Sequence, residues 1–374
     1  MTKSPPMMPG DLDEICRRLR TRAPQAEQHG CLPPENLSEL DRLGVVRSLV
    51  PRRYGGLEIG LGQVLDGLTS IGQACPATAW VGSLLAIHGL MIAWFPVEAQ
   101  NEFWSPGPDT RASSSLAPLG KAIAVPDGIL LEGRWCYASG LDHCDWVLLG
   151  ARLEGRELLA LVPKASCCRE EDWQVCGLSA TGSHSLTIGN LFVPEQRLLF
   201  QDELEAGCAP GLKLHGSSLY RTPWRPLFSS TFVPAALGAA RAALTQARLS
   251  CHSRSSAFTG ISLKDRPFAA RALAQGESLL EMANCLWTQQ LHELDTGVSD
   301  VARATYRPAR IVALCLEAAG GLFPLGGAAA LRLSHPLQRH LRDLQAIALH
   351  PAVVHEAALE VYGRSLMQRL GQPD

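Results

Sequence analysis

The chain has 374 residues, of which 46% are hydrophobic and 19% charged, and its formal net charge is -2 at pH 7. This length allows two domains or one large one, and the near-neutral charge favours neither nucleic acid nor an anionic membrane as a partner. The sequence contains no stretch of eighteen consecutive apolar residues, so we expect no membrane-spanning helix. Segment 1–10 has three prolines, one lysine and no apolar stretch, which is unlike a secretory signal and predicts a cytoplasmic protein.

Twelve cysteines are spread along the chain without the paired spacing of a zinc site, so no metal is predicted. In a chain that lacks a secretory signal, reduced thiols are the expected state. This holds also for the vicinal pair Cys167 and Cys168.

Helical periodicity dominates the first hundred residues. One predicted helix, 76–95, is apolar all round, as expected of a buried helix, and places Trp80, Leu84 and His88 on one face. A buried imidazole needs a partner, so His88 is either a satisfied core residue or part of a site. The other helices are predicted over 11–28, from Pro34 to Gly44, and over 60–74 and 98–104.

Short apolar runs separated by turn residues characterise 111–200 and predict a small antiparallel sandwich or barrel. Within it, 132–149 has the pattern of a β-hairpin whose turn is Ser139-Gly140. The strands are predicted over 121–125, 128–131, 146–149, 157–162 and 187–193.

Beyond residue 200, a connecting segment (201–226) precedes further helices. The small residues between Ala235 and Ala240 permit close helix approach, as in a four-helix bundle. These helices are predicted over 229–252, 267–297 and 299–320, with one or two more in 336–370. The expected fold is α+β, with an N-terminal helical domain (1–110), a middle antiparallel β-domain (111–200) and a C-terminal helical bundle domain (201–374).

Three motifs and their order resemble one known fold. They are Gly133-Arg-Trp-Cys-Tyr-Ala-Ser-Gly140 with Asp145-Trp146, then Gly177-Leu-Ser-Ala-Thr-Gly-Ser183 running into Leu191-Phe-Val-Pro-Glu195, and Pro336-Leu-Gln-Arg339 with Arg342-Asp343 and His350. Together they resemble the acyl-CoA dehydrogenase fold, and within it the oxygenase components of two-component flavin-dependent monooxygenases. The resemblance spans about residues 44–370.

This resemblance implies an enzyme that takes reduced FMN or FAD from a separate flavin reductase. Dioxygen would form a flavin hydroperoxide, which would hydroxylate a small aromatic or nitrogen-containing molecule. The resemblance also implies a homodimer or homotetramer. No nucleotide-binding motif rich in glycine occurs, which agrees with a flavin held by this fold and with a partner reductase.

By the same resemblance, Trp135, Ser139 and the backbone at Gly140 would lie along the flavin, with Thr181 nearby. An ordinary Ser-Gly turn and an ordinary Thr-Gly-Ser turn are the alternatives. His350 would face the substrate as a base or a hydrogen-bond donor, and Asp343, seven residues earlier, could share its helix face. Pro351 disfavours helical geometry at His350 and leaves its direction open.

His88 matches a further active-site histidine of the family. Arg254 resembles an arginine that reaches the flavin phosphates, often across a subunit boundary, and a solvated surface arginine is the alternative. Gln338 and Arg339 could serve a neighbouring subunit, or Arg339 could simply pair with Asp343 one helical turn away.

Two rival functions remain at this point. An acyl-thioester dehydrogenase would need a glutamate base, for which Glu277 or Glu281 are candidates, because Arg342-Asp343 is not followed by the family's Tyr-Glu-Gly-Thr-like segment. A non-catalytic, ligand-binding member of the fold is the other. The histidine at position 350 favours the oxygenase.

Overall fold

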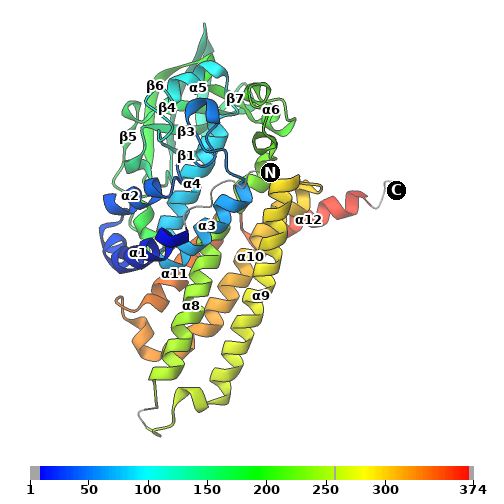
Figure 1. Cartoon of the computed structure of the whole chain (residues 1–374). Helices are drawn as coiled ribbons and strands as arrows, with labels where there is room; N and C mark the ends of the chain where they lie inside the picture. Colours follow the sequence, from blue (N-terminus) through cyan, green and yellow to red (C-terminus); the bar gives the residue numbers. More distant parts are fainter. Residues whose placement is uncertain (1–8, 257, 370–374) are drawn as a thin grey trace.

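A computed structural model describes residues 9–256 and 258–369. Residues 1–8, which carry most of the argument about a secretory signal, and Leu370 lie outside the described residues. The sheet occupies one end of the molecule, and three long helices run side by side away from it (Figure 1). These helices are α8 (Val233–Ser253), α9 (Pro267–Thr296) and α10 (Val301–Leu322).

The N-terminal helices form where the periodicity predicts them. Helix α4 has proline at its first position, where a missing N–H costs nothing, and every one of its residues is buried. His88 is therefore a core residue by position. The five helices are α1 (Pro9–His29), α2 (Pro34–Arg42), α3 (Leu61–Ala74), α4 (Pro76–Ile92) and α5 (Val97–Phe103).

Within the part of the chain that the structure describes, the strands form one seven-stranded sheet in the order β5-β6-β2-β1-β3-β4-β7. The predicted strands all lie within observed ones, but the purely antiparallel arrangement is wrong because β1 and β3 are parallel neighbours. The bounds are β1 (Ala112–Val125), β2 (Gly128–Trp135), β3 (Trp146–Leu153), β4 (Arg156–Pro163), β5 (Cys168–Arg169), β6 (Leu186–Pro194) and β7 (Leu198–Phe200).

The predicted hairpin over 132–149 is also wrong. Strand β1 lies between β2 and β3 in the sheet, so the two strands of the supposed hairpin never pair. Segment 136–145 is instead a crossover that passes from one side of β1 to the other, and Ser139 lies in it. A crossover needs more residues than a tight turn, and the sequence between two apolar runs does not reveal which strand lies between them.

The C-terminal part is helical as predicted. Helices α8 to α11 pack against one another, and α3 packs on α8. The helical conformation is interrupted between the last two helices, α11 (Pro336–Ala348) and α12 (His355–Arg369). His350 therefore follows the end of α11, as expected of a residue before proline. Two short helices, α6 (Gln201–Glu205) and α7 (Trp224–Ser230), lie in the connection before α8.

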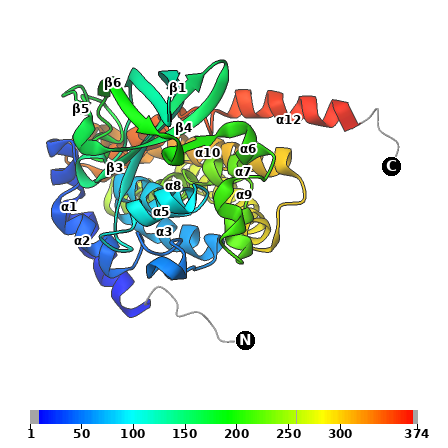
Figure 2. The ribbon, with the colours of Figure 1, turned by 90° about the horizontal axis from the view of Figure 1, so that it is seen from above.

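Helix α12 projects from the body of the molecule in both views (Figures 1 and 2). None of its residues is buried, and its exposed apolar side chains include Leu359, Val361 and Met367.

Two clusters of buried apolar side chains hold the fold together. The larger runs without interruption from α1 through α4 into the bundle, and the smaller lies within the sheet. Because the N-terminal helices and the bundle share one core, the division into three domains at residues 110 and 200 stays a prediction. All twelve cysteines are free thiols.

Among the described residues, two helical segments are long and apolar enough to cross a membrane by length and composition, Trp224–Ser253 and Val301–Leu331. In their most apolar windows, 89% and 50% of residues are buried inside the molecule. Burial of this kind is what the core helices of a bundle show.

Candidate active site

The crossover that carries Ser139 is fixed by backbone and side-chain hydrogen bonds. Ser113 Oγ in β1 donates to the Ser139 carbonyl at 2.8 Å, and Ser115 Oγ donates to the Cys136 carbonyl at 2.8 Å. The N–H groups of Ser139 and Gly140 already donate to the carbonyls of Tyr137 and Thr181. The backbone N–H of Gly140, predicted to meet the flavin, is therefore committed inside the protein.

The Ser139 side chain is the point where three segments meet. The Trp80 indole N–H in α4 donates to Ser139 Oγ at 3.0 Å, and Ser183 Oγ lies 2.8 Å from the same atom. Thr181 Oγ1 lies 2.6 Å from Ser183 Oγ and donates to the Leu178 carbonyl at 2.8 Å. Ser139 and Thr181, predicted from two separate motifs, thus belong to one hydrogen-bonded row.

His88 has partners on both ring nitrogens. Nδ1 lies 2.6 Å from the Ala112 carbonyl, which can only accept, so Nδ1 carries the proton. Burial lowers the pKa of His88 to about 4, so the ring is neutral and Nε2 accepts from Ser114 Oγ at 2.9 Å. Ser113 and Ser115 face the crossover while Ser114 faces α4, because successive strand residues point to opposite faces.

His350 lies among aromatic rings. Its ring centroid is 3.9 Å from that of Phe232, 5.5 Å from Trp80 and 5.8 Å from Phe228. Nδ1 accepts from the Ala352 N–H at 3.3 Å, and burial lowers the pKa of His350 to about 4. The neutral ring therefore carries its proton on Nε2, as a hydrogen-bond donor. His350 and Ser139 thus share Trp80 as a neighbour.

Asp343 does not share the surroundings of His350. Its Oδ1 accepts from the Leu178 N–H at 2.7 Å, so it attaches α11 to the loop that carries Thr181. Burial raises the pKa of Asp343 to about 7, which makes this a carboxyl at the edge of protonation in neutral solution. The helix ends before His350, so a spacing of seven does not bring the two groups onto one face.

The Trp135 side chain lies inside the sheet domain. It is fully buried, and its indole N–H donates to the Gly150 carbonyl at 2.7 Å. The ring packs against Gly120 and Gly133, where a Cβ would come within 2.4 and 3.0 Å of it. The ring presents no surface to a ligand, so we leave Trp135 out of the site and assign it to the core.

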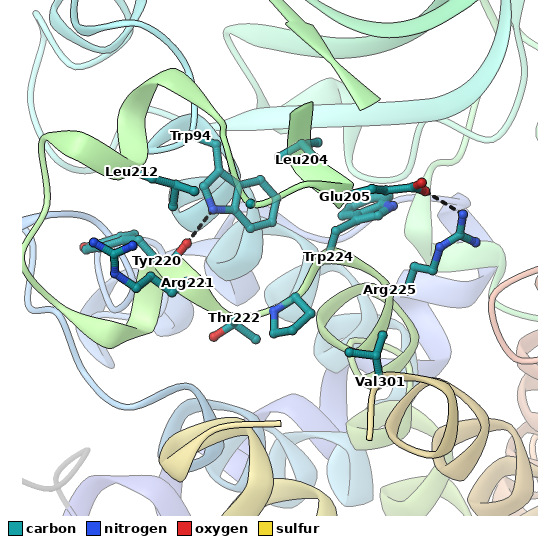
Figure 3. A pocket seen from close by; sticks show the side chains of 12 residues that line it. Trp94, Leu204, Glu205, Leu212, Tyr220, Arg221, Thr222, Trp224, Arg225 and Val301 are labelled. Carbon is teal, nitrogen blue, oxygen red and sulfur yellow. Dashed lines mark hydrogen bonds and ion pairs between the residues drawn. The ribbon is translucent and has the colours of Figure 1, made fainter. Parts of the chain in front are cut away.

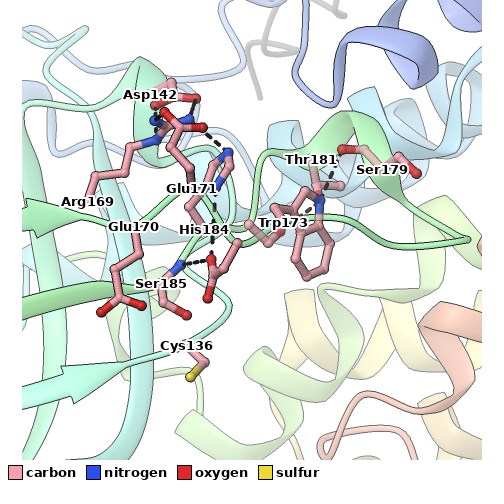
Figure 4. A network of polar contacts seen from close by, with 12 residues as sticks. Cys136, Asp142, Arg169, Glu170, Glu171, Trp173, Ser179, Thr181, His184 and Ser185 are labelled. Atoms are coloured by element: carbon pink, nitrogen blue, oxygen red, sulfur yellow. Dashed lines mark hydrogen bonds and ion pairs between the residues drawn. The ribbon is translucent and has the colours of Figure 1, made fainter.

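A polar network holds the segment around β5 and the loop that precedes β6 in place (Figure 4). Arg169 Nε pairs with Asp142 at 2.9 Å, and Arg169 Nη2 donates to His184 Nε2 at 2.8 Å. The His184 carbonyl accepts from the Ala138 N–H, next to Ser139, and the Trp173 indole donates to the Ser179 carbonyl. The crossover and the 178–184 loop are thus joined on both sides of Ser139.

A cavity of about 290 Å³ lies beside α7, lined by aromatic side chains that include Trp94, Tyr220 and Trp224 (Figure 3). The Trp224 ring stacks on Phe228 at 4.8 Å, and Phe228 contacts His350. The cavity therefore adjoins the aromatic side of the His350 surroundings. The sequence predicted only a connecting segment here.

Arg254 lies elsewhere, at the far end of α8. It lines a second cavity of about 300 Å³ together with Arg266, Ser255 and Ser256, and its Nη1 donates to the Leu325 carbonyl at 2.6 Å. Helix α8 has 21 residues and so spans about 30 Å between Phe232, beside His350, and Arg254. A flavin whose ring lies beside His350 therefore cannot reach Arg254 of the same chain with the phosphate attached to its side chain.

Arg339 is buried beside α1. Its Nη1 lies 3.9 Å from Glu27, and within residues 9–256 and 258–369 its Nε and Nη1 have no hydrogen-bond partner. Gln338 is bonded within α11 and the turn before it. The described residues contain no ion pair between Arg339 and Asp343, so the simple helix pair is not formed.

The glutamates proposed for a dehydrogenase are misplaced for that role. Glu277 and Glu281 lie on the exposed face of α9, and Glu277 pairs with Arg248.

Comparisons with known proteins show the family of this chain. A family model described as acyl-CoA dehydrogenase, C-terminal domain, matches residues 230–355. The chain is 30% identical to the flavin-dependent monooxygenase, oxygenase subunit HsaA, of Mycobacterium tuberculosis, over 94% of this chain and 93% of the relative. It is 29% identical to the p-hydroxyphenylacetate 3-hydroxylase, oxygenase component, of Acinetobacter baumannii, over 95% and 88%. The crystal structure of the 3-HSA hydroxylase from Rhodococcus sp. RHA1 matches with a TM-score of 0.91 and 28% identity, over 99% and 98%.

The chain belongs to the oxygenase components of two-component flavin-dependent monooxygenases. The predicted acyl-CoA dehydrogenase fold, the enzyme class and the dependence on flavin are thereby confirmed. The acyl-thioester dehydrogenase and the non-catalytic member of the fold are set aside.

The surroundings of Ser139 fit a reduced flavin in this oxygenase. Trp80, which donates to Ser139, packs against Phe232 with their ring centroids 4.6 Å apart, so the buried surroundings of Ser139 and His350 are aromatic. Ser139 keeps one free lone pair, and the two nearby histidines are neutral.

Sequence reasoning missed several residues of this site. Trp80 was placed on the same face as His88 but was not recognised as a partner of Ser139. Ser114 could have been found from the run Ser113-Ser114-Ser115, because alternate side chains of a strand must point to opposite sides. Phe228 and Phe232 had no signal beyond being apolar.

Proposed function

We propose that this oxygenase receives reduced FMN or FAD from a separate flavin reductase and hydroxylates a small aromatic molecule that carries a hydroxyl group. Bound reduced flavin supplies the electrons that activate dioxygen for insertion of one oxygen atom into the substrate. The relatives support this reading, since one is named an oxygenase component and acts on p-hydroxyphenylacetate, a phenol. A nitrogen-containing aromatic substrate is the alternative.

The pair of Ser114 and His88 carries the substrate proposal. The Ser114 proton is committed to His88 Nε2, so Ser114 Oγ faces a ligand only as an acceptor. A substrate hydroxyl would donate to that oxygen and be held in one orientation. An analogue without the hydroxyl would leave the acceptor unpaired and be rejected.

His350 and the aromatic rings around it have complementary tasks in this proposal. His350 Nε2–H would donate to an oxygen atom at the place of reaction, and the neutral ring can return to that state after each turnover. Trp80, Phe228 and Phe232 would keep water away from the same place.

A second copy of the chain completes the flavin site in our proposal. Arg254 and Arg266 suit a phosphate because a guanidinium donates in a bidentate fork, but they lie about 30 Å along α8 from Phe232. They would therefore hold the phosphate of a flavin bound at Ser139 of another subunit, in a homodimer or homotetramer. The exposed apolar side chains of α12 support an assembly of this kind. The cytoplasm is the proposed compartment, which the free cysteines support.

The test uses the full-length protein, chemically reduced FMN or FAD, and isotopically labelled dioxygen. Separate reactions contain a phenol, the matching aniline or the matching methyl ether. Mass spectrometry measures the masses of the products. We expect the phenol to gain one labelled oxygen atom and the methyl ether to gain none. Reoxidation of reduced flavin at the same rate with and without protein, with no labelled product, would overturn the proposal.

The variant Ser114→Ala separates the substrate claim from the flavin claim. It should raise the KM for the phenol about tenfold, the loss of one hydrogen bond in a buried site, and leave the affinity for reduced flavin unchanged. An unchanged KM would remove Ser114 from the substrate site.

A further inference from the structure

The hydrogen-bonded row through Ser139 has a direction. It runs from Trp80 Nε1 to Ser139 Oγ, to Ser183 Oγ, to Thr181 Oγ1 and to the Leu178 carbonyl, over distances of 3.0, 2.8, 2.6 and 2.8 Å. The first group can only donate, and the last can only accept.

Each hydroxyl in the row owns a single proton. Thr181 gives its proton to the Leu178 carbonyl, so the bond between Ser183 and Thr181 must use the proton of Ser183. The bond between Ser139 and Ser183 must then use the proton of Ser139. The oxygen of Ser139 also accepts a hydrogen bond from the Trp80 indole. Ser139 therefore has one lone pair left and no proton to offer a ligand.

The row is shielded and anchored at both ends. Trp80, Ser139, Ser183 and Thr181 are all at least 91% buried, so no bulk water competes for their protons. Leu178, at the far end, is itself held because its N–H donates to Asp343 Oδ1 in α11 at 2.7 Å. The orientation of the Ser139 hydroxyl is thus set by groups on α4, on the 178–183 loop and on α11.

We propose that Trp80, Ser183 and Thr181 are positioning residues that make Ser139 a hydrogen-bond acceptor, by which the enzyme prefers reduced flavin to oxidised flavin. This rests on the proposed function, in which the flavin ring lies at Ser139. A reduced flavin ring carries an N–H at its central nitrogen N5, which can donate to Ser139. The oxidised ring has a lone pair there, which would face the lone pair of Ser139.

The main test compares the dissociation constants of reduced and oxidised flavin in anaerobic titrations. Trp80→Phe keeps an aromatic ring and removes the donor, and Ser183→Ala removes the acceptor that takes the Ser139 proton. In Ser183→Ala, Ser139 can turn and donate, so the preference for reduced flavin should fall about tenfold, the worth of one or two hydrogen bonds. In Trp80→Phe, Ser139 loses the donor on its other lone pair but keeps Ser183 as the acceptor of its proton, so the preference should fall by a smaller factor. Ser183→Thr should restore the preference, because it restores the hydroxyl.

Matched controls are available outside the site. Ser48 Oγ is buried and donates to the Val45 carbonyl, and Trp287 is buried in the bundle. Ser48→Ala and Trp287→Phe should leave the ratio of the two dissociation constants at its wild-type value. If they lower it as much as Ser183→Ala and Trp80→Phe do, the effect is general and the proposal is overturned.

A second measurement needs no flavin. In protein labelled with nitrogen-15 on tryptophan, the Trp80 indole resonance is assigned by its absence from Trp80→Phe. It should move in Ser139→Ala, which removes its acceptor, and stay in place in Ser48→Ala. An unmoved resonance in Ser139→Ala would show that the row does not exist in solution.

The outcomes also separate this inference from the proposed function. If wild-type protein binds neither form of flavin, the proposed function fails. If it prefers reduced flavin and the variants keep the full preference, the proposed function stands and the positioning role of Trp80 and Ser183 is overturned.

Discussion

The surroundings of Ser139 and the cavity at Arg254 differ in charge and in exposure to solvent. The polar side chains of the row through Ser139 are neutral, buried and paired with one another, and burial lowers the pKa values of His88 and His350. At Arg254 two guanidinium groups line a more open cavity with serine hydroxyls. The first region suits chemistry on a ring that must be kept from water, and the second suits a charged phosphate.

The two regions also lie at opposite ends of α8. A single chain therefore supplies parts of two different flavin sites in our proposal, and the helix acts as a rigid spacer between them. Replacing His350 in the first region should change chemistry with little effect on flavin affinity, and replacing Arg254 in the second should do the reverse.

Replacing His350 by alanine should lower the rate of substrate hydroxylation about a hundredfold, because a positioned proton donor contributes at least that much. The affinity for reduced flavin should change little. Hydroxylated product is measured by chromatography under single-turnover conditions. His29→Ala, at an exposed position on α1, is the control. A rate like that of wild type would remove His350 from the reaction.

Replacing Arg254 by alanine should raise the dissociation constant of reduced flavin by about tenfold or more, because a charge-assisted bond to phosphate is lost. The loss should be largest at low salt, since salt screens exposed charges. Anaerobic titration at two salt concentrations measures it. Arg248→Ala, six residues earlier on the same helix and paired with Glu277, is the matched control. Equal losses in the two variants would mean a general charge effect.

Mixing tests whether the two regions come from different subunits. Arg254→Ala and His350→Ala proteins are each expected to be impaired, but co-expressed chains would form some sites with both residues intact. Activity should then exceed that of either variant alone, measured per milligram of purified oligomer. Activity no higher than that of Arg254→Ala alone would mean that each flavin takes both residues from one chain or that Arg254 takes no part.

The smallest effect concerns stability. His88 is neutral in the folded protein down to its pKa of about 4 but becomes charged below about 6.5 when unfolded. The unfolded state therefore binds more protons between these values, so the free energy of unfolding falls as pH falls, by up to roughly 3 kcal/mol from this group.

Urea titrations from pH 7 to pH 4 measure this loss. His88→Asn keeps a donor for the Ala112 carbonyl and cannot titrate, so its free energy of unfolding should fall less steeply with pH. His350 contributes in the same direction as His88, whereas Asp343, with its raised pKa of about 7, contributes in the opposite one. The difference between variant and wild type isolates His88, and parallel slopes would contradict its assigned state.

The sequence motifs predicted which segments lie near the candidate site, but not the direction of every side chain in them. Ser139 and Thr181 were predicted because each lies in a short motif that resembles the family, and the structure joins them through Ser183. Trp135 lies in the same motif as Ser139, yet its ring belongs to the core of the sheet. A motif predicts which segment forms the site. The direction of each side chain depends on which strand packs beside that segment.

The sequence by itself determined the helices, most strand positions and the place of the break before His350, because apolar periodicity, proline and turn residues act over a few positions. It also indicated the family, through motifs far apart along the chain. Only the tertiary structure decided that β1 separates β2 from β3, that Asp343 serves Leu178, and that Trp80 donates to Ser139. These features depend on contacts between residues that are many positions apart, and no local pattern encodes the partner of a buried hydrogen bond.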